Sequence, residues 1–128
     1  MSVTYSIQDG ILTMELAGTY LSADVIRQFL KALNDPKCPP RVALLVDVTR
    51  SESLAKRPTD EIRMVAEFLG SYAERIAGRC AVVAAPDVHY GLSQMGSVFS
   101  EAVGVTTRVF RTTSEAIDWL TATPAKQE

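Results

Sequence analysis

Residue types that build metal and redox sites are scarce in this chain of 128 residues. His89 is the only histidine, so a metal site made of histidines is not expected. The two cysteines, Cys38 and Cys80, lie far apart and form no CxxC pattern, which predicts free thiols. Gly-rich phosphate loops, HExxH sequences and paired metal-binding carboxylates are also missing. We therefore expect neither a metal ion nor a cofactor.

Strong charge and long apolar runs are missing as well. The formal net charge is −2, so the sequence lacks the basic stripe that nucleic-acid binding needs. No apolar run is long enough to span a bilayer. The first ten residues, MSVTYSIQDG, alternate polar and apolar side chains and contain no signal-peptide core. We expect a cytoplasmic protein with no nucleic-acid partner and no membrane span.

The composition that remains is that of one globular domain. Hydrophobic residues make up 47% and charged residues 22%, and a chain of this length can bury a substantial core. We place the domain at residues 1–121 and expect residues 122–128 to be a frayed tail.

The first third of the chain predicts a hairpin and a helix. Residues 3–7 alternate apolar and polar side chains, a second strand-like run covers residues 11–17, and Asp9-Gly10 lies between them. This is a strong signal for two antiparallel strands joined by a tight turn. Ser22 is the expected N-cap of a helix over residues 23–34.

The rest of the chain alternates strands with helices. Residues 42–48 are apolar except for Asp47, which suits a strand covered on both faces. The further elements predicted are a helix from about Pro58 or Thr59 to Ala77, a strand over 80–85, a helix over 90–103, a strand at a sheet edge over 106–111, and a last helix opened by the capping box Thr112-x-x-Glu115, with Ala116, Ile117 and Leu120 facing inward. The order β-β-α-β-α-β-α-β-α predicts an α/β fold with a mostly parallel five-stranded sheet and four helices.

Three stretches of the sequence resemble a known family. They are "LLVDVTRS", "RCAVVAAPDVHYGLSQM" and "VFRTTSEAIDWL". Together with the element order they resemble the STAS domain, the fold of anti-sigma-factor antagonists, and in particular its SpoIIAA-like group (STAS/SEC14). The resemblance spans about residues 3–121. It implies a bacterial regulatory module with protein partners, and its SEC14 side implies a lipid or other apolar ligand without dedicated catalytic residues.

The regulatory serine of the antagonists has no counterpart at the matching junction. In that family it stands in an Asp-Ser-Ser/Thr-Gly motif after the third strand. Here the junction reads Asp47-Val48-Thr49-Arg50-Ser51-Glu52-Ser53, with no Asp-Ser pair and no glycine after a serine. No residue is therefore carried over as a phosphoacceptor.

Ligands of open parallel sheets bind beyond the carboxyl ends of the strands, which here points to residues 47–57 and 86–91. The candidates for binding a ligand or partner share a polar or aromatic side chain in these segments. They are Asp47, Thr49, Arg50, Ser51, Ser53, Arg57, His89 and Tyr90, with Lys56 as a further cation. We expect residues 49–57 to be exposed and mobile, with Ser51 the best candidate for modification. The alternatives are a local turn accepting backbone N–H groups at Asp47 and a merely solvated loop.

Catalysis is not expected from this sequence. His89 and Ser93 would share a helix face, but "GLSQMG" departs from the G-x-S-x-G nucleophile elbow at Met95. A capping or packing role for His89 is the preferred interpretation, and a hydrolase remains the minor alternative.

Met64 and Phe68 lie one turn apart, off the main apolar stripe of their helix. They could form the interface of a weak homodimer or be covered by the next helix, predicted over 90–103.

These patterns predict a non-enzymatic regulatory or scaffold module that acts through protein–protein contacts. The alternative is a sensor or carrier for a small apolar or anionic ligand, bound at the carboxyl end of the sheet.

Overall fold

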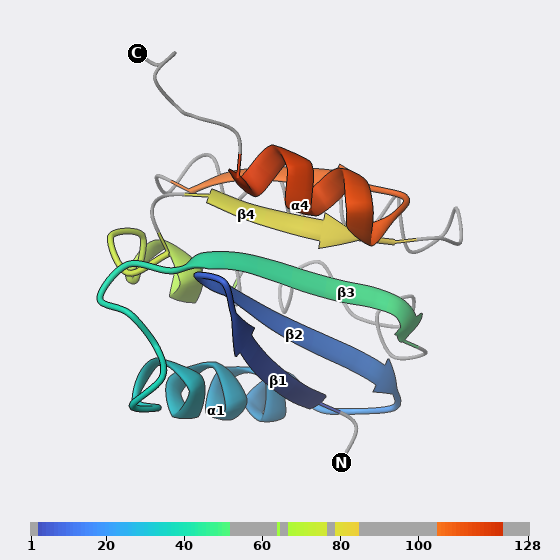
Figure 1. Ribbon diagram of the computed structural model, residues 1–128. Coiled ribbons are helices and arrows are strands. Elements are labelled where there is room, and N and C mark those ends of the chain that lie inside the picture. Colours follow the sequence, from blue (N-terminus) through green and yellow to red (C-terminus); the bar gives the residue numbers. More distant parts are fainter. Residues whose placement is uncertain (1–2, 52–63, 65–66, 77–78, 85–104, 122–128) are drawn as a thin grey trace.

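The computed structural model describes residues 3–51, 64, 67–76, 79–84 and 105–121. These residues form a five-stranded sheet in the order β1-β2-β3-β4-β5 (Figure 1). The strands are β1 (Val3–Gln8), β2 (Ile11–Gly18), β3 (Ala43–Ser51), β4 (Arg79–Val83) and β5 (Thr106–Phe110). The sheet is mixed, because β1 pairs with β2 in antiparallel fashion whereas the pairs β2–β3, β3–β4 and β4–β5 are parallel.

The predicted hairpin turn is confirmed at Asp9-Gly10. Both residues have positive φ, 54° for Asp9 and 79° for Gly10, as a type I′ turn requires. Gln8 stands opposite Ile11, so the turn itself contains only two residues. The local sequence therefore sets the pairing of β1 with β2.

Two helices cover opposite faces of the sheet (Figure 1). Helix α1 (Ser22–Leu33) packs on the face with β1 and β2, where Phe29 is 1% exposed. Helix α4 (Thr113–Thr121) packs mainly on β4 and buries Ala116 and Leu120. Strand β3 is buried on both faces, as its apolar run predicts, since Leu44 and Leu45 are each 0% exposed.

The first helix begins one residue earlier than its sequence predicts. Leu21, and not Ser22, occupies the N-cap position. The Asp24 carboxylate accepts the Leu21 N–H at 3.0 Å, and the Leu21 carbonyl accepts the Asp24 N–H at 2.9 Å. A leucine has no side-chain acceptor, so the Asp24 carboxylate supplies the side-chain bond of this cap.

The helix predicted to reach Ala77 ends earlier. Residues 64 and 67–70 are helical, and residues 71–76 form turns. After Gly70 the chain makes shorter-range bonds, such as Tyr72 N–H to Leu69 C=O at 3.0 Å. Glycine is a poor helix former, and the Ser71 hydroxyl donates to the Phe68 carbonyl at 2.6 Å, which competes with helical bonding.

Arg75 fastens these turns to the connection between α1 and β3. Its guanidinium donates to the Leu33 carbonyl at 3.1 Å and to the Pro39 carbonyl at 3.4 Å. The Val42 N–H in turn donates to the Arg75 carbonyl at 2.8 Å. One residue thus fixes the end of α1 and the entry to β3.

Both cysteines are free, as predicted. Cys80 is buried in β4, and burial raises the pKa of its thiol to about 12. Cys38 is half-buried in the connection between α1 and β3.

The last strand and helix follow the sequence with one correction. β5 lies at the sheet edge, and the Thr112 hydroxyl accepts the Glu115 N–H at 3.2 Å, as the capping box predicts. Ile117 does not face inward but is 37% exposed, because α4 turns only Ala116 and Leu120 fully into the core.

The helix predicted over 90–103 and the tail at 122–128 lie outside the described residues. Within the described part of the chain, no helix is long and apolar enough to cross a membrane.

Candidate functional site

The carboxyl ends of four strands meet at one edge of the sheet. Ser51 at the end of β3 stands opposite Gly18 at the end of β2, and Val83 of β4 stands opposite Phe110 of β5. Gly18 has a φ of 66°, which lets the chain leave β2 in a left-handed turn toward α1. This edge is where the sequence places a ligand or partner site.

Asp47 is engaged inside its own strand. The Thr49 N–H and hydroxyl both donate to Asp47 Oδ1, at 2.9 and 2.7 Å. The pairing of β2 with β3 shifts just here, since Glu15 faces Asp47 but Ala17 faces Arg50. The extra residue in β3 makes a bulge, and the Asp47 carboxylate holds it. The predicted local bond from a backbone N–H to Asp47 is confirmed, but it lies in a strand bulge and not in a loop turn.

Ser51 is a buried strand residue, and this overturns the expectation that an exposed segment begins at residue 49. Strand β3 continues through Ser51, which is 2% exposed. Its hydroxyl is 2.7 Å from the Tyr20 hydroxyl, and Tyr20 is 7% exposed. The strand continues because β2 offers backbone partners as far as Gly18. Ser51 is thus a poor site for modification of the folded chain.

Arg50 points to solvent beside an acidic partner. Its guanidinium is 3.3 Å from the Glu15 carboxylate, and the two side chains are 67% and 44% exposed. A pair this exposed adds little stability. The Glu15 carboxylate offsets the positive charge that the sequence predicts for anion binding at Arg50.

The remaining sequence candidates at this edge lie outside the described residues. They are Ser53, Lys56, Arg57, His89 and Tyr90.

Sequence reasoning missed Leu21, which is 66% exposed at the start of α1. It follows the buried Tyr20, and the Asp24 carboxylate fixes its backbone. An apolar side chain is thus exposed on an ordered backbone at the carboxyl end of the sheet. No periodic pattern could have found it, because Leu21 lies in a connection between a strand and a helix.

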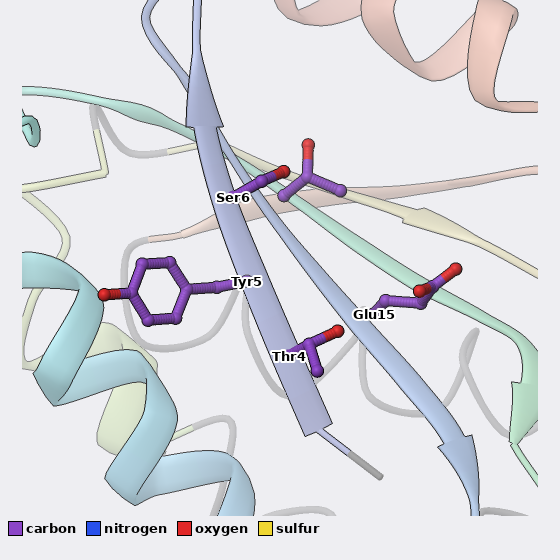
Figure 2. A pocket seen from close by; sticks show the side chains of 5 residues that line it. Thr4, Tyr5, Ser6 and Glu15 are labelled. Atoms are coloured by element: carbon purple, nitrogen blue, oxygen red, sulfur yellow. The ribbon is translucent and has the colours of Figure 1, made fainter. Parts of the chain in front are cut away.

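A shallow hollow of about 300 Å³ lies on the hairpin. Thr4, Tyr5, Ser6, Thr13 and Glu15 line it. In Figure 2 the Tyr5 side chain points toward α1, whereas Thr4, Ser6 and Glu15 point to the opposite side. The hollow is polar and open, so it does not offer the enclosed apolar volume that a lipid tail needs.

Tyr5 and Asp35 connect β1 to the end of α1. The Tyr5 hydroxyl donates to Asp35 Oδ2 and the Lys37 N–H donates to Asp35 Oδ1, each at 2.9 Å. The Lys37 N–H, and then the Tyr5 hydroxyl, hold the pKa of Asp35 below its ordinary value of 3.8. The bond to Asp35 raises the pKa of Tyr5 above 10.0.

This arrangement predicts that Asp35 contributes to acid denaturation. A carboxyl whose pKa is lower in the folded state stabilises the fold above its unfolded pKa, and that stability is lost as the pH falls. We therefore expect the urea concentration at the midpoint of unfolding to fall less for Asp35→Asn than for the wild type when the pH is lowered from about 6 to about 2.5. Tyr5→Phe should show a smaller change in the same direction. Asp118→Asn, at an exposed position, is the control and should behave like the wild type. If the urea midpoint falls equally in the wild type and in Asp35→Asn, Asp35 does not contribute to acid denaturation.

The predicted Met64/Phe68 ridge is wrong for Phe68. The Phe68 ring packs against the core, with ring centroids 5.6 Å from Phe29 and 5.1 Å from Tyr72. Phe29 of helix α1 packs against it, whereas the alternative was coverage by the next helix, which lies outside the described residues. Met64 is 47% exposed, but it does not form an exposed pair with Phe68.

Metal-binding side chains are dispersed in the described part of the chain. There, no group of three or more His, Cys, Asp and Glu side chains is close enough to hold an ion.

A solved structure with the same arrangement comes from Shewanella loihica PV-4. It is that of an uncharacterized protein from the DUF3478 family with a SpoIIAA-like fold. The two chains superpose with a TM-score of 0.58 at 17% sequence identity, over 92% of this chain and 91% of the other. The fold is SpoIIAA-like.

The SpoIIAA-like fold confirms the resemblance seen in the sequence. At this identity the likeness shows the fold alone. No protein-family model matches the chain, and no curated protein matches it.

Proposed function

We propose that this protein is a non-enzymatic regulatory or scaffold module that acts through protein–protein contacts at the carboxyl end of its sheet. The observation that carries the proposal is the exposed Leu21 side chain on an ordered backbone. Ordering a flexible residue on binding costs free energy, so an exposed apolar side chain on a backbone that is already ordered is a favourable anchor. The exposed Arg50–Glu15 pair, from the neighbouring ends of β3 and β2, supplies polar groups for the rim of such an interface.

The internal bonds of the candidate polar groups also support a binding role. Asp47 accepts two bonds from Thr49, and the Ser51 hydroxyl is buried against Tyr20. A general base or a nucleophile must reach a substrate, and neither group is directed at an open site. The SpoIIAA-like fold, commonly a regulatory or protein-interaction module, is compatible with the same role.

The test compares Leu21→Asp with Ile117→Asp, which places the same charge on the exposed face of α4. Aspartate is a good N-cap residue, so Leu21→Asp removes the apolar side chain without weakening α1. The tagged wild type and both variants are used to capture proteins from the cells in which the chain occurs, and the captured proteins are quantified by mass spectrometry. Calorimetry then measures the affinity of the captured partner for each chain. We expect Leu21→Asp to weaken binding at least about tenfold and Ile117→Asp to leave it unchanged.

Native mass spectrometry of the purified chain separates this role from that of a ligand carrier. Two results together would favour a ligand carrier over the proposed role. They are a small molecule that stays bound to the purified wild type, and partner binding that is equal in Leu21→Asp and Ile117→Asp.

A further inference from the structure

Strand β1 forms one edge of the sheet in the part of the chain that the structure describes. Among the described residues it pairs only with β2, and its six residues, VTYSIQ, carry no charge. Strand β5, at the opposite edge, has the exposed Arg108 at its centre. Charged residues protect sheet edges against pairing with other strands, and uncharged edges lack that protection. The two edges therefore differ in their capacity to accept a further strand.

The hairpin turn determines which backbone groups of β1 face outward. In an antiparallel pair joined by a two-residue turn, the residues that flank the turn bond to each other, and every second residue does the same. Gln8, Ser6 and Thr4 therefore direct their N–H and C=O groups toward β2. The outward groups belong to Val3, Tyr5 and Ile7.

We propose that β1 is a dimerisation edge that pairs with β1 of a second copy of this chain, antiparallel and centred on Tyr5. Tyr5 then stands opposite Tyr5 of the other copy, and Val3 opposite Ile7. In this alignment Val3, Tyr5 and Ile7 can all form backbone hydrogen bonds with the other copy. The two-fold axis of the dimer then runs between the two Tyr5 residues. Centres at Thr4 or Ser6 would pair fewer of the outward groups.

In this alignment each side chain of β1 meets one of the same kind from the other copy. Val3, Tyr5 and Ile7 lie on the α1 face, and Thr4 and Ser6 lie on the opposite, exposed face. A centre at Tyr5 keeps apolar residues opposite apolar ones and places Thr4 opposite Ser6 of the other copy. Pairs of aliphatic, aromatic and hydroxyl side chains stabilise neighbouring strands.

Helix α1 leaves room for the second copy. It starts beside the end of β2, where Val3 pairs with Leu16, and it ends near Tyr5, whose hydroxyl reaches Asp35. Val3 is 1% exposed, whereas Ile7, next to the hairpin turn, is half-buried against the core. A rotation about Tyr5 brings the other copy's Val3 next to Ile7, so the dimer covers the part of β1 that α1 leaves open.

A charge exchange on the exposed face tests both the surface and the alignment. Thr4→Lys/Ser6→Lys places like charges opposite each other twice across the two-fold axis, and Thr4→Lys/Ser6→Glu places opposite charges there. Neither pair disturbs the buried face. Thr106→Lys/Ser114→Lys, at exposed positions on β5 and α4, is the control for added charge. Sedimentation equilibrium of the full chain, with circular dichroism as a check on folding, gives the dimer dissociation constant of each variant.

We expect a concentration-dependent dimer in the wild type, weakened on the order of tenfold or more by the double lysine variant. The lysine–glutamate variant should dimerise at least as well as wild type, and the control should match wild type. Wild type that stays monomeric up to millimolar concentration overturns the proposal. So does a dimer that tolerates the double lysine variant, or one that both β1 variants weaken equally.

Discussion

Ser51→Asp is expected to lower the free energy of unfolding by about 3–5 kcal/mol at neutral pH, because it places a carboxylate where the structure holds a buried hydroxyl. Ser51 is 2% exposed, and its side chain lies 2.7 Å from the Tyr20 hydroxyl. The Tyr20 hydroxyl does not replace the hydration of an ionised carboxylate. Urea unfolding followed by circular dichroism measures the loss.

The destabilisation caused by Ser51→Asp should increase as the pH rises. Burial raises the folded-state pKa of the introduced carboxyl above its unfolded value of about 3.9. The variant is then least destabilised below about pH 4, and its deficit grows as the pH rises toward the folded pKa. Thr106→Asp, at an exposed position of β5, is the control and should change stability by less than about 0.5 kcal/mol. A deficit at residue 51 that is equally small and independent of pH would show that the side chain is accessible to water.

This result bears on regulation of the fold. A phosphate adds more negative charge than an aspartate carboxylate, so modification of Ser51 requires that the end of β3 first separate from Tyr20. Regulation through Ser51 would therefore operate on a partly opened chain. The proposed partner surface around Leu21 needs no such opening.

Phe29→Ala is expected to destabilise the fold by about 3–5 kcal/mol. Phe29 is 1% exposed and makes edge-to-face contacts with Phe68 and Tyr72, both at 5.6 Å between ring centroids. The substitution leaves a cavity between α1, the sheet and the segment that contains Phe68. It also removes two aromatic contacts that stabilise the core beyond their buried area.

Phe110→Ala is the control for Phe29→Ala. Phe110 is half-buried and contacts Trp119 at 5.7 Å, so its surroundings can rearrange and water can reach the site. Phe110→Ala should lower the free energy of unfolding by about half as much as Phe29→Ala, or less. Equal losses measured by urea unfolding would mean that the aromatic cluster around Phe29 is not the main contact between α1 and the rest of the core.

Sequence reasoning was reliable where the signal lies within one element. The Asp9-Gly10 turn, the apolar run of β3 and the capping box at Thr112 each act on residues close in the chain, and each is found where it was predicted. Local backbone preferences and side-chain hydrogen bonds decide such features, so a single sequence contains them. The SpoIIAA-like fold was predicted from the element order and from the resemblance of three stretches to the STAS domain, and it is confirmed.

The candidate site depended on contacts between distant segments, and here the sequence was insufficient. Polar residues after Val48 looked like a loop, yet β3 continues to Ser51 because β2 runs beside it as far as Gly18. Leu21 was overlooked because its exposure follows from the path of the chain after Gly18.

The sequence by itself determined the hairpin turn and the position of each strand, apart from the end of β3, because those depend on periodicity and short-range bonding. Only the tertiary structure decided that Phe68 packs against Phe29 of α1, that Ser51 is buried against Tyr20, and that β1 is an edge strand among the described residues. The physical reason is that burial at these positions is set by neighbours far away in the chain. The hydrophobicity of a residue and its spacing do not reveal which neighbour will cover it.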